Sequence, residues 1–192
     1  THRLAMRLIE SIVTDAPAMA TLRRDLHAHP ELCFEERRTS GVIAQQLTEW
    51  GIPIHRGLGT TGIVAILKNG TSGRAVGLRA DMDALPMTER NQFAHASRHA
   101  GRMHACGHDG HTTMLLAAAK HLARHRNYDG TVYLLFQPAE EGGGGAREMI
   151  ADGLFEKFPM EAIFGVHNWP GIPYGQFAIK NGPCFASSNE FR

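Results

Sequence analysis

The sequence predicts an α/β sandwich, in which helices flank a mostly parallel central sheet in three layers. Short apolar runs typical of strands alternate along the chain with longer segments whose apolar residues recur at helical spacing. Proline or glycine follows several of these segments and is suited to end them. Apolar residues make up 43% of the 192 residues, which is enough for a packed core.

The first part of the chain predicts two helices and then strands. Apolar residues at helical spacing predict a helix over 2–29, which Pro30 ends. A second apolar stripe predicts a helix over 35–50, and Gly51 is suited to end it. Continuous or alternating apolar runs then predict strands over 52–55, 62–67 and 75–80.

The second part repeats the alternation of helix and strand. Residues 83–106 are polar and show no regular period, so we expect an irregular segment there. Met114, Ala118 and Leu122 recur every four residues and predict a helix over 109–125. The remaining predicted elements are a strand over 131–136, a short helix over 146–151, and strands over 162–166 and 176–180.

Charge and composition disfavour several classes of protein. The formal net charge is +1, so no basic excess exists to neutralise the phosphates of a nucleic acid. No apolar run approaches the roughly 20 residues of a membrane span. Three cysteines cannot form a disulfide framework, and we expect Cys33 and Cys184 to be inert thiols. We therefore expect a cytoplasmic protein with neither nucleic-acid nor membrane partners.

Metal-binding side chains follow three predicted strands or precede the long helix. They are Asp81, Asp83, Cys106, His108, Glu140, Glu141 and His167. Because ligands bind beyond the carboxyl ends of the strands in open α/β sheets, we expect these side chains to meet at one edge. Thiolate, imidazole and carboxylate bind divalent transition metals such as zinc, manganese, cobalt or nickel. The set is richer than one ion requires, which predicts two ions roughly 3.5–4 Å apart.

Simpler interpretations exist for some of these residues. Cys106 taken alone is as well suited to be a small buried side chain as a ligand. For His111, a capping or supporting role is favoured over metal ligation. The glycine run at 142–145 is not followed by the Lys-Ser/Thr pair of a phosphate-binding loop, which argues against a nucleotide site.

Five segments resemble the signatures of a known family. Their sequences are LRRDLHAHPEL (22–32), RADMDALP (79–86), HACGHDGH (104–111), QPAEE (137–141) and GVHN (165–168). Together they resemble the amidohydrolase branch of the aminoacylase/carboxypeptidase metallohydrolases. The resemblance implies a chain about twice this length, commonly a homodimer. Residues 1–184 would then be the N-terminal part of a catalytic domain, and 185–192 the start of a truncated lid and dimerisation domain.

The same resemblance implies roles for single residues. The implied metal ligands are Cys106, His108, Glu141 and His167. Glu140 is the implied general base, and Asp83 the aspartate that assists beside the metals. Asp81 stands where more distant relatives place a ligating histidine, so we expect it, Asp109 and His111 to support the ligands from behind. One further family ligand, a histidine near the far C-terminus, has no counterpart in this sequence.

The resemblance implies hydrolysis of the amide bond of N-acyl amino acids such as hippurate. The expected binding partner is therefore a small-molecule substrate. The alternative is a truncated metal-binding domain with weak or no activity, because one ligand and the lid are missing. A purely structural zinc module is disfavoured, since no second Cys-x-x-Cys arm is present.

Overall fold

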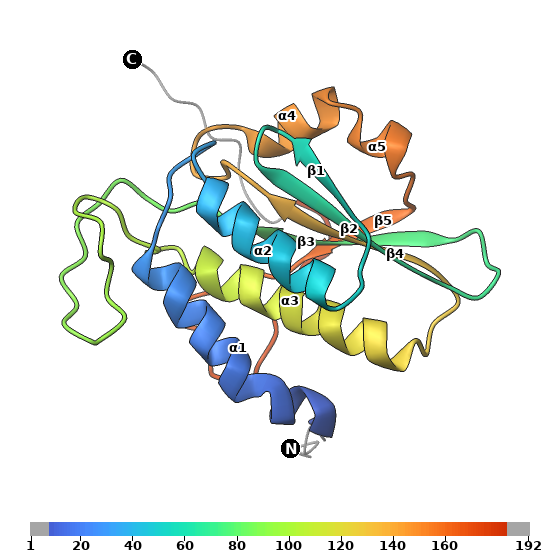
Figure 1. Cartoon of the computed structure of the whole chain (residues 1–192), viewed down its shortest axis with the longest axis horizontal. Helices are drawn as coiled ribbons and strands as arrows, with labels where there is room; N and C mark the ends of the chain where they lie inside the picture. The colour runs from blue at the N-terminus through green and yellow to red at the C-terminus, as the bar shows by residue number, and fades with distance from the viewer. Residues whose placement is uncertain (1–7, 184–192) are drawn as a thin grey trace.

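The alternation of buried side chains along the central strands sets the layers of the fold. A computed structural model describes residues 8–183. Three longer helices, α1 (Glu10–Ala28), α2 (Arg37–Glu49) and α3 (His108–His125), are well separated from two short ones, α4 (Gly145–Ala151) and α5 (Leu154–Lys157) (Figure 1). Helices thus cover both faces of a five-stranded sheet, and the predicted α/β sandwich is confirmed.

The sheet has the strand order β1-β2-β4-β3-β5. Its strands are β1 (Ile54–Leu58), β2 (Gly62–Asn69), β3 (Ala75–Asp81), β4 (Gly130–Gln137) and β5 (Ala162–Gly165). The pairs β3–β4 and β3–β5 are parallel, whereas β1–β2 and β2–β4 are antiparallel. The sheet is therefore mixed and not mostly parallel. Residues 59–61 alone join β1 to β2, and a parallel pair needs a crossover of a dozen residues or more.

Two cores lie on opposite faces of the sheet. On one face, Ile63 of β2 packs in a cluster with Leu47 of α2 and Leu116 of α3. On the other face, Val64 packs with Met149 of α4, in a cluster that also includes Leu154 of α5. Adjacent residues of one strand thus serve different cores, because successive side chains of a strand point to opposite faces.

Several boundaries differ from the prediction. The described part of the first helix begins at Glu10, and the part predicted over 2–7 lies outside the described residues. The short helix α5 was not predicted, since four residues are too few to show a period. Residues 83–106 are irregular, as predicted, apart from one isolated bridge between Leu85 and Met103.

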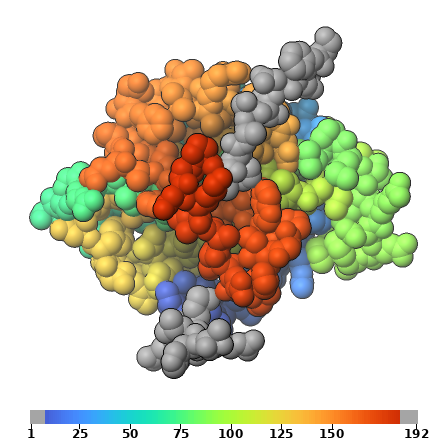
Figure 2. All heavy atoms as spheres, turned by 180° about the vertical axis from the view of Figure 1, so that it is seen from behind, coloured from blue at the N-terminus to red at the C-terminus, as the bar shows by residue number. Residues whose placement is uncertain are grey.

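The strand predicted over 176–180 does not form. Phe177 and Ile179 are 78% and 99% exposed, so their apolar alternation meets no neighbouring strand among residues 8–183. Exposed apolar side chains also continue back to Phe164 of β5. Figure 2 shows this last described part of the chain on the surface, in red and orange.

Among the described helices, none has the length and hydropathy that a bilayer crossing requires.

Candidate metal centre

The carboxyl ends of three strands bring the predicted residues to one edge of the sheet. Asp81 is the last residue of β3, Glu140 and Glu141 follow β4, and His167 follows β5. The helix α3 begins at His108 beside this edge. Before it, Gly107 adopts φ 89°, a left-handed conformation that favours glycine and turns the chain between Cys106 and His108.

His108 lies at the centre of the cluster. Its side chain is completely buried, and Nδ1 lies 2.9 Å from the main-chain oxygen of Asp83 and 3.1 Å from Oδ1 of the same residue. Because both partners are acceptors, Nδ1 carries the proton and donates. Nε2 has no hydrogen-bond partner and lies 3.7 Å from Oε1 of Glu141. A histidine that donates one ring nitrogen to a carbonyl or carboxylate is oriented as metal-ligating histidines are.

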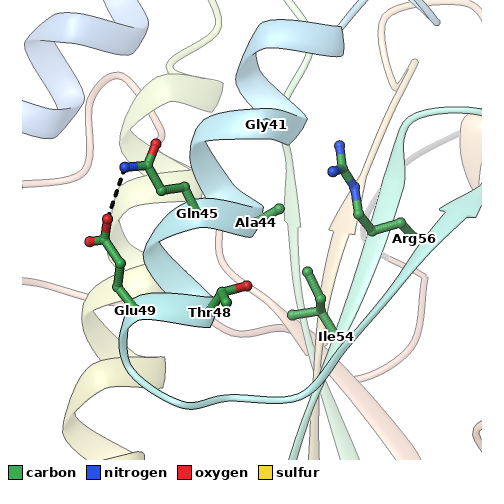
Figure 3. A pocket seen from close by; sticks show the side chains of 7 residues that line it. All are labelled: Gly41, Ala44, Gln45, Thr48, Glu49, Ile54 and Arg56. Carbon is green, nitrogen blue, oxygen red and sulfur yellow. Dashed lines mark hydrogen bonds between the residues drawn. The ribbon is translucent and has the colours of Figure 1, made fainter.

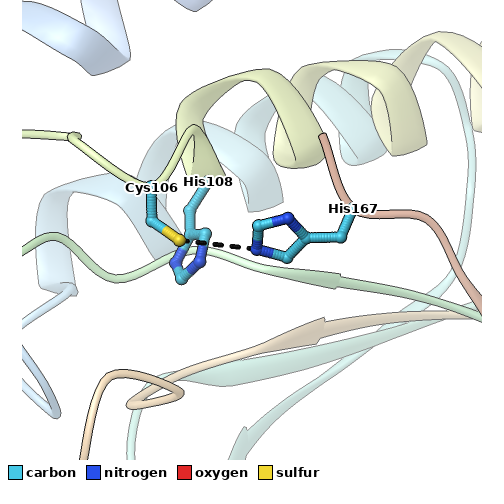
Figure 4. Close-up of side chains that lie close together, drawn as sticks. All are labelled: Cys106, His108 and His167. Atoms are coloured by element: carbon cyan, nitrogen blue, oxygen red, sulfur yellow. Dashed lines mark hydrogen bonds between the residues drawn. The ribbon is translucent and has the colours of Figure 1, made fainter. Parts of the chain in front are cut away.

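Cys106, two residues before His108, and His167, from the segment after β5, approach the same point. The Cys106 Sγ lies 3.4 Å from Nε2 of His167, and the His108 and His167 rings are nearly perpendicular at 87° (Figure 4). Each of the three offers one ligand atom, and these atoms lie within 4.8 Å of one another. The His167 side chain is at the surface, and Cys106 is half-buried.

The two neighbouring glutamates complete a second group with His108. Their offered oxygens and a nitrogen of His108 also lie within 4.8 Å of one another. Oε1 of Glu141 is buried without a hydrogen-bond partner, whereas the Glu140 side chain is 41% exposed. The main-chain N–H of Glu141 donates to Oδ2 of Asp83 at 2.9 Å. Asp83 therefore orients His108 with one oxygen and the Glu141 backbone with the other.

Negative charge dominates this cluster. Burial raises the pKa of the Cys106 thiol to about 12, and a hydrogen bond to Glu141 and the charges of both glutamates add to the rise. Burial alone would lower the pKa of His108, but the Asp83 hydrogen bond and the nearby carboxylates raise it overall. The protein alone thus favours protons on the thiol and the imidazole. Together with the two buried partnerless ligand atoms, this electrostatic field fits a bound divalent cation.

Asp81 and His111 lie directly behind the cluster. His111 Nδ1 donates to Oδ1 of Asp81 at 2.6 Å, and Arg79 pairs with the other oxygen at 2.7 Å. Burial alone would raise the pKa of Asp81, but these two partners bring it down to about 2. Asp81, His108 and His111 also offer ligand atoms within 4.8 Å of one another. Since both oxygens of Asp81 already accept hydrogen bonds, the geometry favours a supporting role.

Asp109 faces α1 and not the cluster. Its Oδ2 accepts hydrogen bonds from His27 at 3.0 Å and Arg23 at 3.1 Å. These contacts attach the first turn of α3 to the end of α1, so Asp109 supports the helix that carries His108.

Burial raises the pKa of the Cys33 thiol to about 11, in keeping with the inert thiol that we predict. Cys184 lies outside the described residues.

Sequence reasoning assigned no role to three residues that the structure places at this site. The Glu36 carboxylate is completely buried and accepts from the main-chain N–H of Ala139, 103 positions away. His104 is buried, and neither of its ring nitrogens has a hydrogen-bond partner. The main-chain N–H of Asn168 donates to Nε2 of His111 at 3.1 Å. His104 and Asn168 stand in two of the segments that resemble the family signatures. Nothing in the sequence marks Glu36, because its role depends on a contact between distant segments.

Two hollows lie at different places relative to the cluster. One of about 440 Å³ between α2 and β1 is lined by Ala44, Ile54, Arg56 and their neighbours (Figure 3). It contains none of the predicted site residues. Another of about 740 Å³ is lined largely by apolar side chains from residues 164–179 and includes His167 itself. The second hollow therefore opens directly beside the candidate ligands.

Known proteins of similar sequence are named as a hydrolase and a deacetylase, and one of similar structure is described as binding two metals. The chain is 47% identical over 186 residues to a hippurate hydrolase of Campylobacter jejuni, and the match covers 97% of this chain and 48% of that protein. It is 44% identical over 172 residues to an N-acetyl-L-cysteine deacetylase of Bacillus subtilis, covering 89% and 41% of the two chains. A crystal structure of a Bacillus subtilis protein described as a dinuclear metal-binding peptidase of the M20 family superposes with a TM-score of 0.84. The two sequences are 40% identical, and the superposition covers 89% of this chain and 48% of that one.

The chain thus spans about half the length of the curated relatives it matches. A sequence model of one family, peptidase family M20/M25/M40, matches residues 77–184. The matched region contains the motifs around Asp81, Cys106, Glu140 and His167, which the fold brings to one edge of its sheet. Since the match extends over more than half of the 192 residues, the chain belongs to peptidase family M20/M25/M40.

Proposed function

We propose that this chain is the metal-binding part of a hydrolase that cleaves the amide bond of N-acyl amino acids. The observation that carries the proposal is the meeting of two buried ligand atoms that make no hydrogen bond, Nε2 of His108 and Oε1 of Glu141, 3.7 Å apart. Such atoms are costly to bury unless a ligand satisfies them. The names of the relatives, hippurate hydrolase and N-acetyl-L-cysteine deacetylase, support an N-acyl amino acid as substrate.

Two divalent ions are the proposed cofactors, zinc, manganese, cobalt or nickel among them. Cys106, His108, Glu141 and His167 would hold them, because these residues offer ligand atoms in two groups that share His108. Bound ions would acidify the attacking water and polarise the amide carbonyl. Asp83 keeps the proton on Nδ1 of His108, so that Nε2 presents its lone pair to the site.

Glu140 is the proposed general base. Its carboxylate lies 4.0 Å from Nε2 of His108 and is partly exposed, so it can reach both the site and an entering substrate. The carboxylate would take the proton of the attacking water and return it to the leaving amine nitrogen. The products would be a carboxylic acid and a free amino acid. The apolar hollow beside His167 supports binding of the acyl group there.

The proposed domain organisation follows the same family. Residues 1–184 would form the N-terminal part of the catalytic domain, and 185–192, which lie outside the described residues, would begin the lid and dimerisation domain. The match to the family model, which extends to residue 184, supports the boundary after that residue.

A second function is a metal-binding domain with weak or no turnover. The exposed side chain of His167, which leaves this candidate ligand open to water, favours it. The test measures bound metal by mass spectrometry and hippurate hydrolysis, in the chain and in its Glu140→Gln variant. Metal in both proteins, with turnover reduced roughly 10²- to 10⁴-fold in the variant, would support the hydrolase. Metal without turnover in either would support the second function, and absence of metal would refute both.

A further inference from the structure

Glu36 is a buried carboxylate without a cation to balance it. The residue precedes α2 at its N-cap position, yet its side chain makes no capping hydrogen bond. Instead, Oε2 accepts from the hydroxyl of Thr61 at 2.7 Å, and Oε1 accepts from the main-chain N–H of Ala139 at 2.9 Å. No ion pair of Glu36 occurs within residues 8–183. A buried charge of this kind lowers the stability of the fold. We therefore expect the residue to have a function that explains why it is buried.

The contact with Ala139 fixes an unusual backbone. Ala139 is completely buried and has φ 51°, a left-handed conformation that residues other than glycine rarely adopt. Its carbonyl accepts from the N–H of Gly145 at 3.0 Å, so Glu36 supplies the remaining partner that the buried peptide group needs. A Cβ at Gly145 would lie 1.8 Å from the oxygen of Pro138, which shows how closely this segment folds back on itself.

Glu140 and Glu141 follow Ala139 directly. Between them, the N–H of Glu141 donates to Oδ2 of Asp83 at 2.9 Å. Two buried carboxylates therefore hold the backbone of residues 139–141. Glu36 accepts from the N–H of Ala139, and Asp83 accepts from the N–H of Glu141. A rotation at Ala139 would turn both glutamate side chains away from His108, because they leave the chain within two residues of that point.

We propose that Glu36 is a positioning residue, whose carboxylate holds the Ala139 backbone in the conformation that aims Glu140 and Glu141 at the metal site. The inference rests on the proposed function, since it assigns meaning to where these two glutamates lie. Outer contacts of this kind change metal affinity about 10- to 100-fold when they are removed. Glu36→Ala removes both acceptors, whereas Glu36→Gln keeps one acceptor for the Ala139 N–H.

The test titrates Co²⁺ into the metal-free chain and follows its visible absorption, with amide hydrogen exchange measured on the same metal-free variants. Glu36→Ala should weaken Co²⁺ binding about 10- to 100-fold and speed exchange at Ala139 and Glu141 more than elsewhere. Glu36→Gln should stay within a few-fold of the wild type in both. Leu47→Ala, on the buried face of α2, is the control, because it lowers stability without touching the 139–141 segment.

Wild-type Co²⁺ affinity in Glu36→Ala would overturn the inference, as would an equal loss of affinity in Leu47→Ala. If the wild-type chain binds no Co²⁺, the proposed function fails. The exchange data then decide the positioning role alone: faster exchange confined to residues 139–141 supports it, and unchanged exchange refutes it.

Discussion

His104 should make the protein less stable in mild acid. Its side chain is 4% exposed, and both ring nitrogens lack hydrogen-bond partners. Burial lowers its pKa from 6.5 to about 4, although the nearby charge of Asp109 acts in the opposite direction. The folded protein thus holds His104 neutral at a pH where the unfolded chain has already bound a proton.

The size of the effect follows from the two pKa values. Between pH 6.5 and about 4 the unfolded state binds more protons, so the free energy of unfolding falls as the pH falls. Each unit of difference between the unfolded and folded pKa of His104 corresponds to about 1.4 kcal/mol. The free energy of unfolding is therefore lower by about 3 kcal/mol once the pH is below 4. At pH 5 the loss relative to pH 7 is about 2 kcal/mol. This is a large share of the stability of a typical domain.

Urea unfolding at pH 7 and pH 5, in the presence of a chelator, measures the loss. His104→Leu removes the titrating group but keeps an apolar side chain in its place. The wild type should lose about 2 kcal/mol more than this variant between the two pH values. His125→Gln, at an exposed histidine, should follow the wild type. Equal losses in the wild type and His104→Leu would refute the reasoning, because His104 would then titrate alike in both states.

Three further predictions concern the contacts around the site and the core. A hydrogen bond to Asp109 raises the pKa of His27, so its stabilisation is present below pH 6.5 and disappears as the pH rises through the raised value. His27→Gln should therefore lower the free energy of urea unfolding more at pH 6 than at pH 9, and an equal loss at both would contradict the assignment. Asp83→Asn should weaken metal binding about 10- to 100-fold in calorimetric titration, because the carboxylate orients His108; unchanged affinity would remove it from that role. Phe136→Ala should cost about 3–5 kcal/mol in urea unfolding, since the ring is completely buried in the core beneath α2 and α3, and a loss under 1 kcal/mol would mean that the core closes around the gap.

The predictable parts of the fold are those with a local pattern. The apolar runs at 62–67 and 131–136 form β2 and β4, because both faces of these strands are covered by helices. The run at 176–180 has a similar pattern but no partner strand among the described residues, and it stays irregular. The apolar pattern could not predict strand direction either. The short link between β1 and β2, and not the sequence of either strand, makes this pair antiparallel.

The candidate site also has residues that the sequence predicts and one that it does not. Cys106, His108, Glu140, Glu141 and His167 could be named from the sequence because each stands at the end of a recognisable element. Their roles as ligands or base stay predictions that the metal and turnover assays test. Glu36 could not be named, since a glutamate ahead of a helix is as a rule solvated, and only the folded chain brings Ala139 to it.

Gly107 offers a way to disturb the packing beside the site without altering any candidate ligand. A Cβ at this position would lie 2.4 Å from Oδ1 of Asn168, the residue after His167. Even a single methyl group would therefore displace the Asn168 side chain from its place beside His111, on a backbone that already disfavours any side chain. The absence of a side chain at residue 107 thus leaves room for Asn168, which follows β5, beside the start of a helix about sixty residues earlier in the sequence.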